Sequence, residues 1–115
     1  MSKLSTVISG MQRTTFSVEK YCKIKKYITI KEKFEFIDEY KKQMELHSED
    51  YEGFEELISF VFFNLMVIKK YTDIELEMTY DEFDMLMEFG LFKKIVDVIG
   101  DDYKLLLEFT KMVNM

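Results

Sequence analysis

One histidine, one cysteine and several carboxylate clusters are the residues of this 115-residue chain whose types could do chemistry. His47 lies beside Glu45, Glu49 and Asp50, and the chain has no second histidine for a metal site or a Ser-His-Asp triad. Cys22 is surrounded by lysines, which lower the pKa of a thiol, but the sequence places no general base beside it. We therefore interpret His47 as a surface residue and Cys22 as a packed or half-exposed structural residue.

Two clusters of carboxylates lie at 75–84 and 97–102. Neither has the alternating ligands, central glycine and closing glutamate of an EF-hand calcium loop, and no Glu-x-x-His motif of a di-iron site occurs. Carboxylates at the start of a helix are stabilised by the helix dipole, so these clusters are interpreted as caps and solubilising residues. The four glycines are too far apart for a phosphate loop. The sequence predicts no catalytic residue, no metal and no cofactor, and hence a protein that is not an enzyme.

The charge is divided between a basic beginning and an acidic remainder. The chain carries a net charge of −6, with six basic residues against one acidic residue in 1–30 and 10 basic against 21 acidic residues in 31–115. The basic segment could contact nucleic acid or an acidic partner, or it could fold onto the acidic body of its own chain or of a neighbouring copy. The second interpretation is favoured because an acidic body is repelled by nucleic acid.

The apolar stretches of the chain are too short to predict a membrane protein. The longest, at 57–68, is interrupted by Ser59 and Asn64, whereas a membrane-spanning helix needs about 20 residues. No long apolar segment follows Lys3, as a secretory signal would require. A single cysteine cannot form an internal disulfide. We expect no membrane contact and synthesis in a reducing, cytoplasm-like compartment.

The hydrophobic pattern predicts a mainly α protein with an N-terminal arm. Residues 1–15 are polar and weakly patterned, which predicts a flexible arm. Residues 16–28 alternate β-forming residues with lysines, which predicts one or two short strands. Residues 16–115 are expected to form a single helical domain, a compact bundle of about five helices around a buried central helix at about 54–71. The absence of proline and the scarcity of glycine argue against an all-β fold.

Two capping boxes mark helix starts, at Thr29-Ile-Lys-Glu32 and at Thr79-Tyr-Asp-Glu82. The first helix is expected to end near His47. Its predicted inward stripe consists of Ile30, Phe34, Ile37, Tyr40 and Met44. The segment at 57–68 is apolar around most of its circumference, which predicts a helix covered on several sides. Glycines at 90 and 100 separate three shorter helices, the last of them capped by one of the aspartates at 101 and 102.

Two sets of residues are candidates for contact with a partner. The basic set consists of Arg13, Lys20, Lys23, Lys25 and Lys26. The large apolar side chains of the central helix form either the core of a monomer or a surface that seats a partner helix, and from them we select Phe60 and Phe63. A homo-oligomer or a larger assembly would cover the surplus of apolar residues.

Several short patterns occur in an order that resembles a family of small phage proteins. These patterns are Lys25-Lys26-Tyr27-Ile28 before the first helix, Tyr71-Thr72-Asp73-Ile74 after the apolar helix, and Asp101-Asp102-Tyr103 before the last helix. Over about residues 18–113 they resemble small uncharacterised proteins encoded among the virion and assembly genes of phages and prophages in low-GC Gram-positive hosts.

This resemblance implies a non-enzymatic structural or assembly protein at the portal or head–tail connector, on the capsid or in the tail. The implied partners are other virion or assembly proteins, with a homo-oligomer or ring as the expected state. The implied location is the virion, after synthesis in the cytoplasm of the host cell. Two alternatives stay open: a small acidic helical regulator or inhibitor that binds a host protein, and a nucleic-acid-binding module that uses the basic N-terminal segment.

Overall fold

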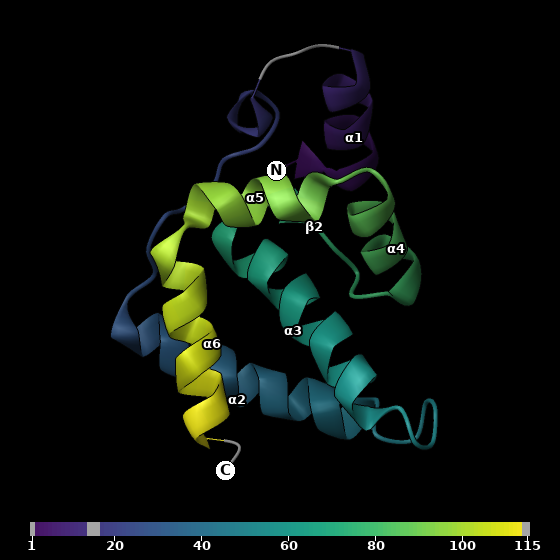
Figure 1. Ribbon diagram of the computed structural model, residues 1–115, viewed down its shortest axis with the longest axis vertical. Coiled ribbons are helices and arrows are strands. Elements are labelled where there is room, and N and C mark those ends of the chain that lie inside the picture. The colour runs from purple at the N-terminus through teal and green to yellow at the C-terminus, as the bar shows by residue number, and fades with distance from the viewer. Residues whose placement is uncertain (1, 14–16, 114–115) are drawn as a thin grey trace.

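Helices make up most of the chain, as the hydrophobic pattern predicts (Figure 1). The computed structural model describes residues 2–13 and 17–113, without the side chain of Arg13. The helices are α1 (Leu4–Arg13), α2 (Ile30–Leu46), α3 (Glu55–Tyr71), α4 (Tyr80–Glu88), α5 (Leu91–Ile99) and α6 (Asp101–Val113). Two short parallel strands, β1 (Ser2–Lys3) and β2 (Ile74–Glu75), and a 3-10 turn (Val18–Lys20) complete the described part.

Helix α3 is the central helix that the sequence predicts. Figure 1 shows it running through the middle of the molecule, with α2, α4, α5 and α6 arranged around it. All residues from 62 to 68 are buried, so this part of α3 is covered on every side. In its first half, Leu57 and Phe60 are exposed. The central helix therefore belongs to the core at one end and to the surface at the other.

Helix α2 begins and ends as predicted but is rotated from its predicted orientation. Its buried residues are Lys33, Phe36, Ile37 and Tyr40. Ile30 and Phe34, expected to face inward, are 48% and 59% exposed. The buried Lys33 explains the rotation, because its ammonium group forms an ion pair with Asp102 of α6. The predicted stripe was wrong at Ile30 and Phe34, since a pattern of apolar residues cannot anticipate a lysine on the inner face.

The N-terminal segment is folded, and the prediction of a flexible arm is wrong for residues 2–13. Leu4, Val7 and Ile8 lie on one face of α1 and are buried in the core. The amide of Ser2 donates a hydrogen bond to the carbonyl of Asp73 at 2.8 Å, and β1 pairs with β2. The apolar spacing of 4, 7 and 8 is helical, but it is too short to stand out in a polar segment. Residues 1, 14 and 15 of the predicted arm lie outside the described residues.

The predicted strands at 16–28 are also corrected. Residue 16 is not described, and residues 17–28 contain the 3-10 turn and one isolated antiparallel bridge between Ile24 and Thr72. The carboxylate of Asp73 holds this segment, accepting from the amide of Lys23 at 2.9 Å and from the hydroxyl of Ser2 at 3.2 Å. The strands lie instead at the start of the chain and after α3.

Both predicted capping boxes are present. The hydroxyl of Thr29 accepts from the amide of Glu32 at 3.1 Å, and Thr79 accepts from Glu82 at 3.2 Å. In each box the glutamate side chain accepts from the threonine amide in return. The hydrogen bond from the Thr29 amide, followed by the charges of Lys25 and Lys70, lowers the pKa of Glu32. These local interactions explain why the starts of α2 and α4 could be predicted to the residue.

Candidate protein-binding surfaces

An apolar surface is exposed where the 47–54 loop enters α3. Tyr51, Phe54, Leu57 and Phe60 are between 53% and 61% exposed. A groove of about 240 Å³ runs among the first three of them and is closed by Ile58, Val61 and Tyr80. Neighbouring apolar side chains that are exposed together are typical of surfaces that bind other molecules.

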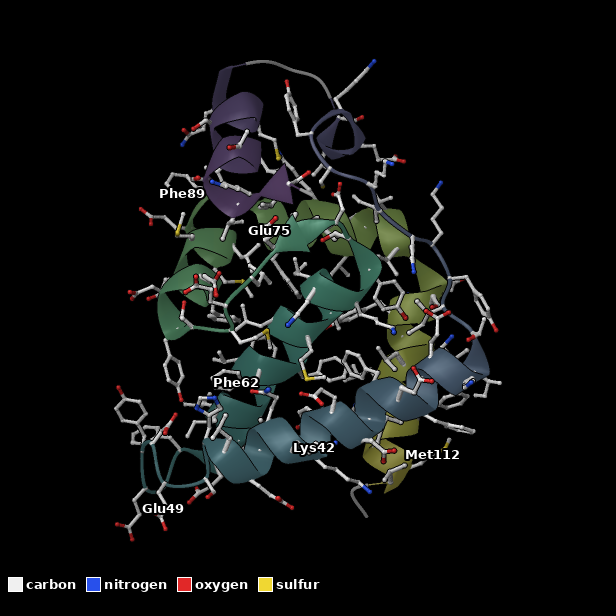
Figure 2. The ribbon with its side chains drawn as sticks, turned by 180° about the vertical axis from the view of Figure 1, so that it is seen from behind. Lys42, Glu49, Phe62, Glu75, Phe89 and Met112 are labelled. Atoms are coloured by element: carbon white, nitrogen blue, oxygen red, sulfur yellow. The ribbon has the colours of Figure 1, made fainter. Side chains whose placement is uncertain are left out.

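The same surface is surrounded by carboxylates. Six acidic residues and no lysine or arginine occur between positions 45 and 56, and all six are exposed. They are Glu45, Glu49, Asp50, Glu52, Glu55 and Glu56. Figure 2 shows Glu49 on the loop that projects beyond the helices. We call these residues, together with Leu46, Tyr51, Phe54, Leu57 and Phe60, the acidic surface.

His47, Asp50 and Tyr80 fix the loop that carries this surface. The Nδ1 atom of His47 lies 2.6 Å from Oδ2 of Asp50, and the hydroxyl of Tyr80 donates to the same oxygen at 2.7 Å. The His47 ring stacks on the buried ring of Phe62, with centroids 3.9 Å apart. His47 is thus half-buried rather than a plain surface residue. Its position at the end of α2 joins the loop to α3 and α4.

These hydrogen bonds make the loop sensitive to acid. The bond from Tyr80, followed by the bond from His47, lowers the pKa of Asp50 below its usual range. Burial and the bond to Asp50 raise the pKa of Tyr80 to about 12, so its hydroxyl remains a donor at neutral pH. A carboxylate whose folded pKa is lowered stabilises the fold above its unfolded pKa of about 4 and stops doing so as the pH falls through the folded value.

We therefore expect Tyr80→Phe to lower the melting temperature at pH 7, and this difference from the wild type to shrink below about pH 4. The measurement is a series of thermal melts between pH 7 and pH 3. Tyr103→Phe is the matched control, because the hydroxyl of Tyr103 donates to the neutral amide oxygen of Asn64 at 2.8 Å. Its effect should not follow the titration of a carboxylate. A Tyr80→Phe difference that stays constant with pH would contradict the role given to Asp50.

The two aromatic residues predicted to bind a partner have different positions. Phe60 is 53% exposed, and its ring contacts that of Phe83 on α4. Phe63 is buried, with edge-to-face contacts to Phe36 and Tyr40 of α2. The prediction is therefore wrong for Phe63, which faces α2 as a core residue. Sequence reasoning missed Tyr51, Phe54 and Leu57. The six acidic residues around them, with no lysine or arginine in the same stretch, are nevertheless visible in the sequence.

The predicted basic residues form part of a second exposed surface. Lys20, Lys23, Lys25 and Lys26 are all exposed in the segment that precedes α2. Lys25 lies 3.8 Å from the carboxylate of Glu32. Arg13 ends α1, but its side chain is outside the described part of the chain. Four of the five predicted basic residues are thus exposed on one segment of the chain.

Apolar side chains are exposed beside these lysines. Tyr27, Ile30 and Phe34 are exposed at the start of α2, and Leu105 of α6 is exposed across a hollow of about 510 Å³. The residues that line the hollow are Lys26, Tyr27, Ile99, Asp101, Asp102 and Leu105. We call the basic surface the set made of Lys20, Lys23, Lys25, Lys26, Tyr27, Ile30, Lys31, Phe34 and Leu105.

A buried ion pair beneath the basic surface was missed by sequence reasoning. Nζ of Lys33 lies 2.9 Å from Oδ1 of Asp102 and donates to the carbonyl of Ile28 at 2.6 Å. Asp102 also accepts from the amide of Ile28 at 3.0 Å and from the hydroxyl of Tyr71 at 2.7 Å. Burial and then the bond to Asp102 raise the pKa of Tyr71. The centroid of the Tyr27 ring lies 4.1 Å from Nζ of Lys33, so this ring covers the ammonium group.

Cys22 is a structural residue, as expected. It is buried, and its Sγ atom lies 3.8 Å from the carbonyl of Val18. Burial is the main reason, with the nearby carboxylates of Asp73 and Glu19, that its pKa is raised to about 11. The thiol is therefore protonated at neutral pH and behaves as a small apolar side chain.

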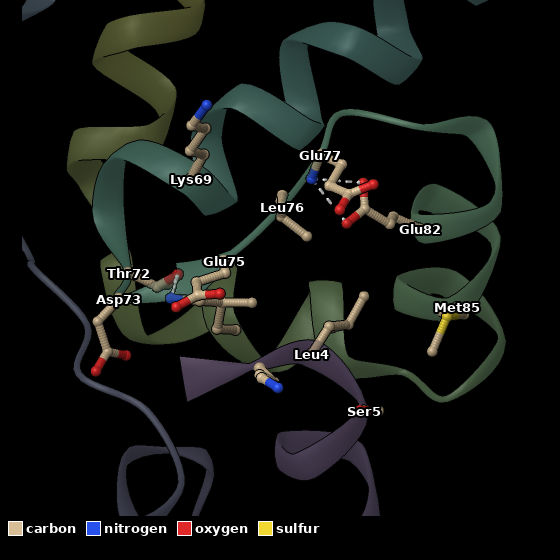
Figure 3. A pocket seen from close by; sticks show the side chains of 12 residues that line it. Leu4, Ser5, Lys69, Thr72, Asp73, Glu75, Leu76, Glu77, Glu82 and Met85 are labelled. Atoms are coloured by element: carbon tan, nitrogen blue, oxygen red, sulfur yellow. Dashed lines mark hydrogen bonds between the residues drawn. The ribbon is translucent and has the colours of Figure 1, made fainter. Parts of the chain in front are cut away.

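A cleft of about 960 Å³ lies between β1, β2 and α4 (Figure 3). Figure 3 shows the carboxylate of Glu82 turned towards the backbone of Glu77, whose amide donates to both of its oxygens. Asp73 holds Ser2 and Lys23, as described above. Two of the carboxylates in this cleft thus hold the backbone in place. Within residues 2–13 and 17–113, no group of three His, Cys, Asp or Glu side chains is arranged to hold a metal ion.

Taken together, the fold defines a small mainly α protein with two charged apolar surfaces. No protein-family model matches the chain, and neither curated proteins nor solved structures give a match to it. None of the helices in the described part of the chain is long and apolar enough to cross a membrane.

Proposed function

We propose that this protein acts through protein–protein contacts, as a structural or assembly component rather than as an enzyme. The observation that carries the proposal is the acidic surface, where Tyr51, Phe54, Leu57 and Phe60 are more than half exposed. Aromatic side chains held in fixed positions are the anchors that protein interfaces use most. The His47–Asp50–Tyr80 hydrogen bonds hold this loop in advance, which reduces the entropy lost on binding.

The resemblance of the sequence to phage virion and assembly proteins supplies the setting of this proposal. In that setting the protein is a component of the portal or head–tail connector, the capsid or the tail, and its partners are other proteins of the particle. The protein then acts in the virion after synthesis in the host cytoplasm. Two surfaces on one small chain suit a component that joins neighbours on both sides.

The test is site-specific crosslinking in the cells that encode the protein. A photoreactive phenylalanine analogue replaces Phe54 in one variant and Glu88 in the control, because Glu88 is exposed at the end of α4, beside Phe89, which Figure 2 shows far from Glu49. We expect Phe54 to capture defined protein partners, identified by mass spectrometry as components of a particle. Capture at Phe54 that is no stronger than capture at Glu88 would overturn the proposal.

A further inference from the structure

The acidic and basic surfaces lie at opposite ends of α2. The basic surface lies on the segment before Ile30, the first residue of this helix, and on the turns that follow it, whereas the acidic surface begins in the last turn, which ends at Leu46. A helix of this length separates its ends by about 25 Å. Figure 1 shows the two ends of α2 on opposite sides of the molecule. A single copy therefore cannot bring its own two surfaces together.

The charges of the two surfaces are complementary. Five lysines and no acidic residue occur between positions 20 and 31, while six acidic residues and no lysine or arginine occur between 45 and 56. All of these side chains are exposed. Glu32 and Asp101 lie near the lysines and reduce the positive charge. Five lysines against these two carboxylates still leave the basic surface an excess of positive charge. Opposite potentials on two patches steer them together and fix their orientation.

The apolar parts of the two surfaces are also matched in kind. Phe54 and Leu57 are exposed on the acidic surface. On the basic surface Tyr27 and Leu105 line the hollow of about 510 Å³, and Phe34 is exposed on α2. Each surface thus combines exposed apolar side chains with an excess of charge of one sign. That is the arrangement of a protein interface, in which an apolar centre is surrounded by a polar rim.

We infer that the acidic surface of one copy binds the basic surface of a second copy, so that the chain assembles head to tail. This inference rests on the proposed function and names the partner at both surfaces. Because the two surfaces differ, the contact is heterologous and leaves one free surface at each end of a dimer. Repetition closes a ring if the rotation between copies allows it, and otherwise extends a filament.

The first experiment blocks one surface at a time. Phe34→Asp disables the basic surface and Phe54→Asp disables the acidic surface, and both replaced side chains are more than half exposed. Light scattering and sedimentation are measured over a concentration series. We expect the wild type to grow beyond a dimer, each variant alone to remain a 13.9 kDa monomer, and their equimolar mixture to stop at a dimer. Glu88→Lys, a charge change at the exposed end of α4 outside both surfaces, should assemble like the wild type.

The second experiment exchanges the charges. Replacing Glu45, Glu49, Glu52 and Glu56 with lysine leaves two carboxylates against four lysines on the acidic surface, so that both surfaces are basic. Replacing Lys23, Lys25, Lys26 and Lys31 with glutamate leaves one lysine against four carboxylates on the basic surface, so that both surfaces are acidic. We expect each fourfold variant alone to lose association at low salt at least tenfold, and the mixture of the two to recover it, because every contact is again between opposite charges. High salt should weaken wild-type association, since exposed charges are screened. Circular dichroism melts verify that each variant is folded.

Several outcomes overturn the inference. A mixture of Phe34→Asp and Phe54→Asp that stays monomeric, or either variant dimerising alone, excludes a head-to-tail contact between these surfaces. A wild type that is monomeric at every concentration also excludes it. This holds even if the monomer binds a short DNA duplex through Lys26 and Lys31. If the wild type is monomeric while Phe54 still captures a different protein in cells, the proposed function stands and only the identity of the partner is wrong.

Discussion

Deletion of residues 2–13 is expected to unfold most of the protein at room temperature. Leu4, Val7 and Ile8 of α1 are at most 6% exposed and belong to the central core. Burial of one large aliphatic side chain contributes about 1.5–3 kcal/mol, so the three together contribute between about 5 and 9 kcal/mol. A domain of this size has a total stability of about 5–15 kcal/mol. Urea denaturation followed by circular dichroism measures the loss.

A pair of point variants separates burial from chain length. Val7→Asp places a carboxylate at a position with no exposed area, whereas Ser9→Asp places it on the exposed face of the same helix. An unpaired buried carboxylate is costly, so Val7→Asp should approach the effect of the deletion. Ser9→Asp should change the unfolding free energy by less than about 0.5 kcal/mol. A deletion variant with an unchanged cooperative melt would show that α1 is not part of the core.

The parts of the fold that the sequence predicts are those built from local interactions. The starts of α2 and α4 follow from capping boxes that span four residues, Thr29 to Glu32 and Thr79 to Glu82. Gly90, with a φ of 69°, ends α4 because glycine adopts the left-handed conformation without strain. The residues of α3 are apolar around most of its circumference, which directly predicts that this helix is buried. None of these signals depends on which distant segment lies nearby.

The parts that could not be predicted depend on partners far away in the sequence. Lys33 is buried because Asp102, 69 positions later, supplies the opposite charge. The strand at Ser2 forms because the segment after α3 offers it a free edge. When the sequence is read without knowledge of that edge, the first residues are predicted to be an arm. When it is read without knowledge of the pairing with Asp102, a lysine on the inner face of α2 is not expected. Long-range pairing thus decided the N-terminus and the orientation of α2.

The candidate surfaces were predicted in part for the same reason. The basic segment and Phe60 could be selected from the sequence, because lysine runs and apolar helices are local features. Whether an aromatic residue of α3 lies in the core depends on which face meets α2, and this places Phe63 inside and Phe60 outside. Periodicity gives the angle between the two side chains but not the direction of the neighbouring helix.

Removal of one charge from the buried pair is expected to cost about 3–5 kcal/mol of unfolding free energy. The side chains of Lys33 and Asp102 are both at most 4% exposed. Lys33→Met therefore leaves the carboxylate of Asp102 buried without a countercharge, and Asp102→Asn leaves the ammonium group of Lys33 buried without one. The surface pair Lys93–Asp97 is the matched control, with side chains 84% and 66% exposed. Lys93→Met should cost less than about 1 kcal/mol.

The double variant Lys33→Met with Asp102→Asn shows whether the cost comes from isolated charge. With both charges removed, the neutral Asn side chain is able to accept from the amide of Ile28 and the hydroxyl of Tyr71, which donate to Asp102 in the wild type. We expect the double variant to be more stable than either single variant, with a coupling energy above about 2 kcal/mol in the double-mutant cycle. Additive effects in urea denaturation would mean that the two side chains stabilise the fold separately. In that case the rotation of α2 would need a cause other than attraction between Lys33 and Asp102.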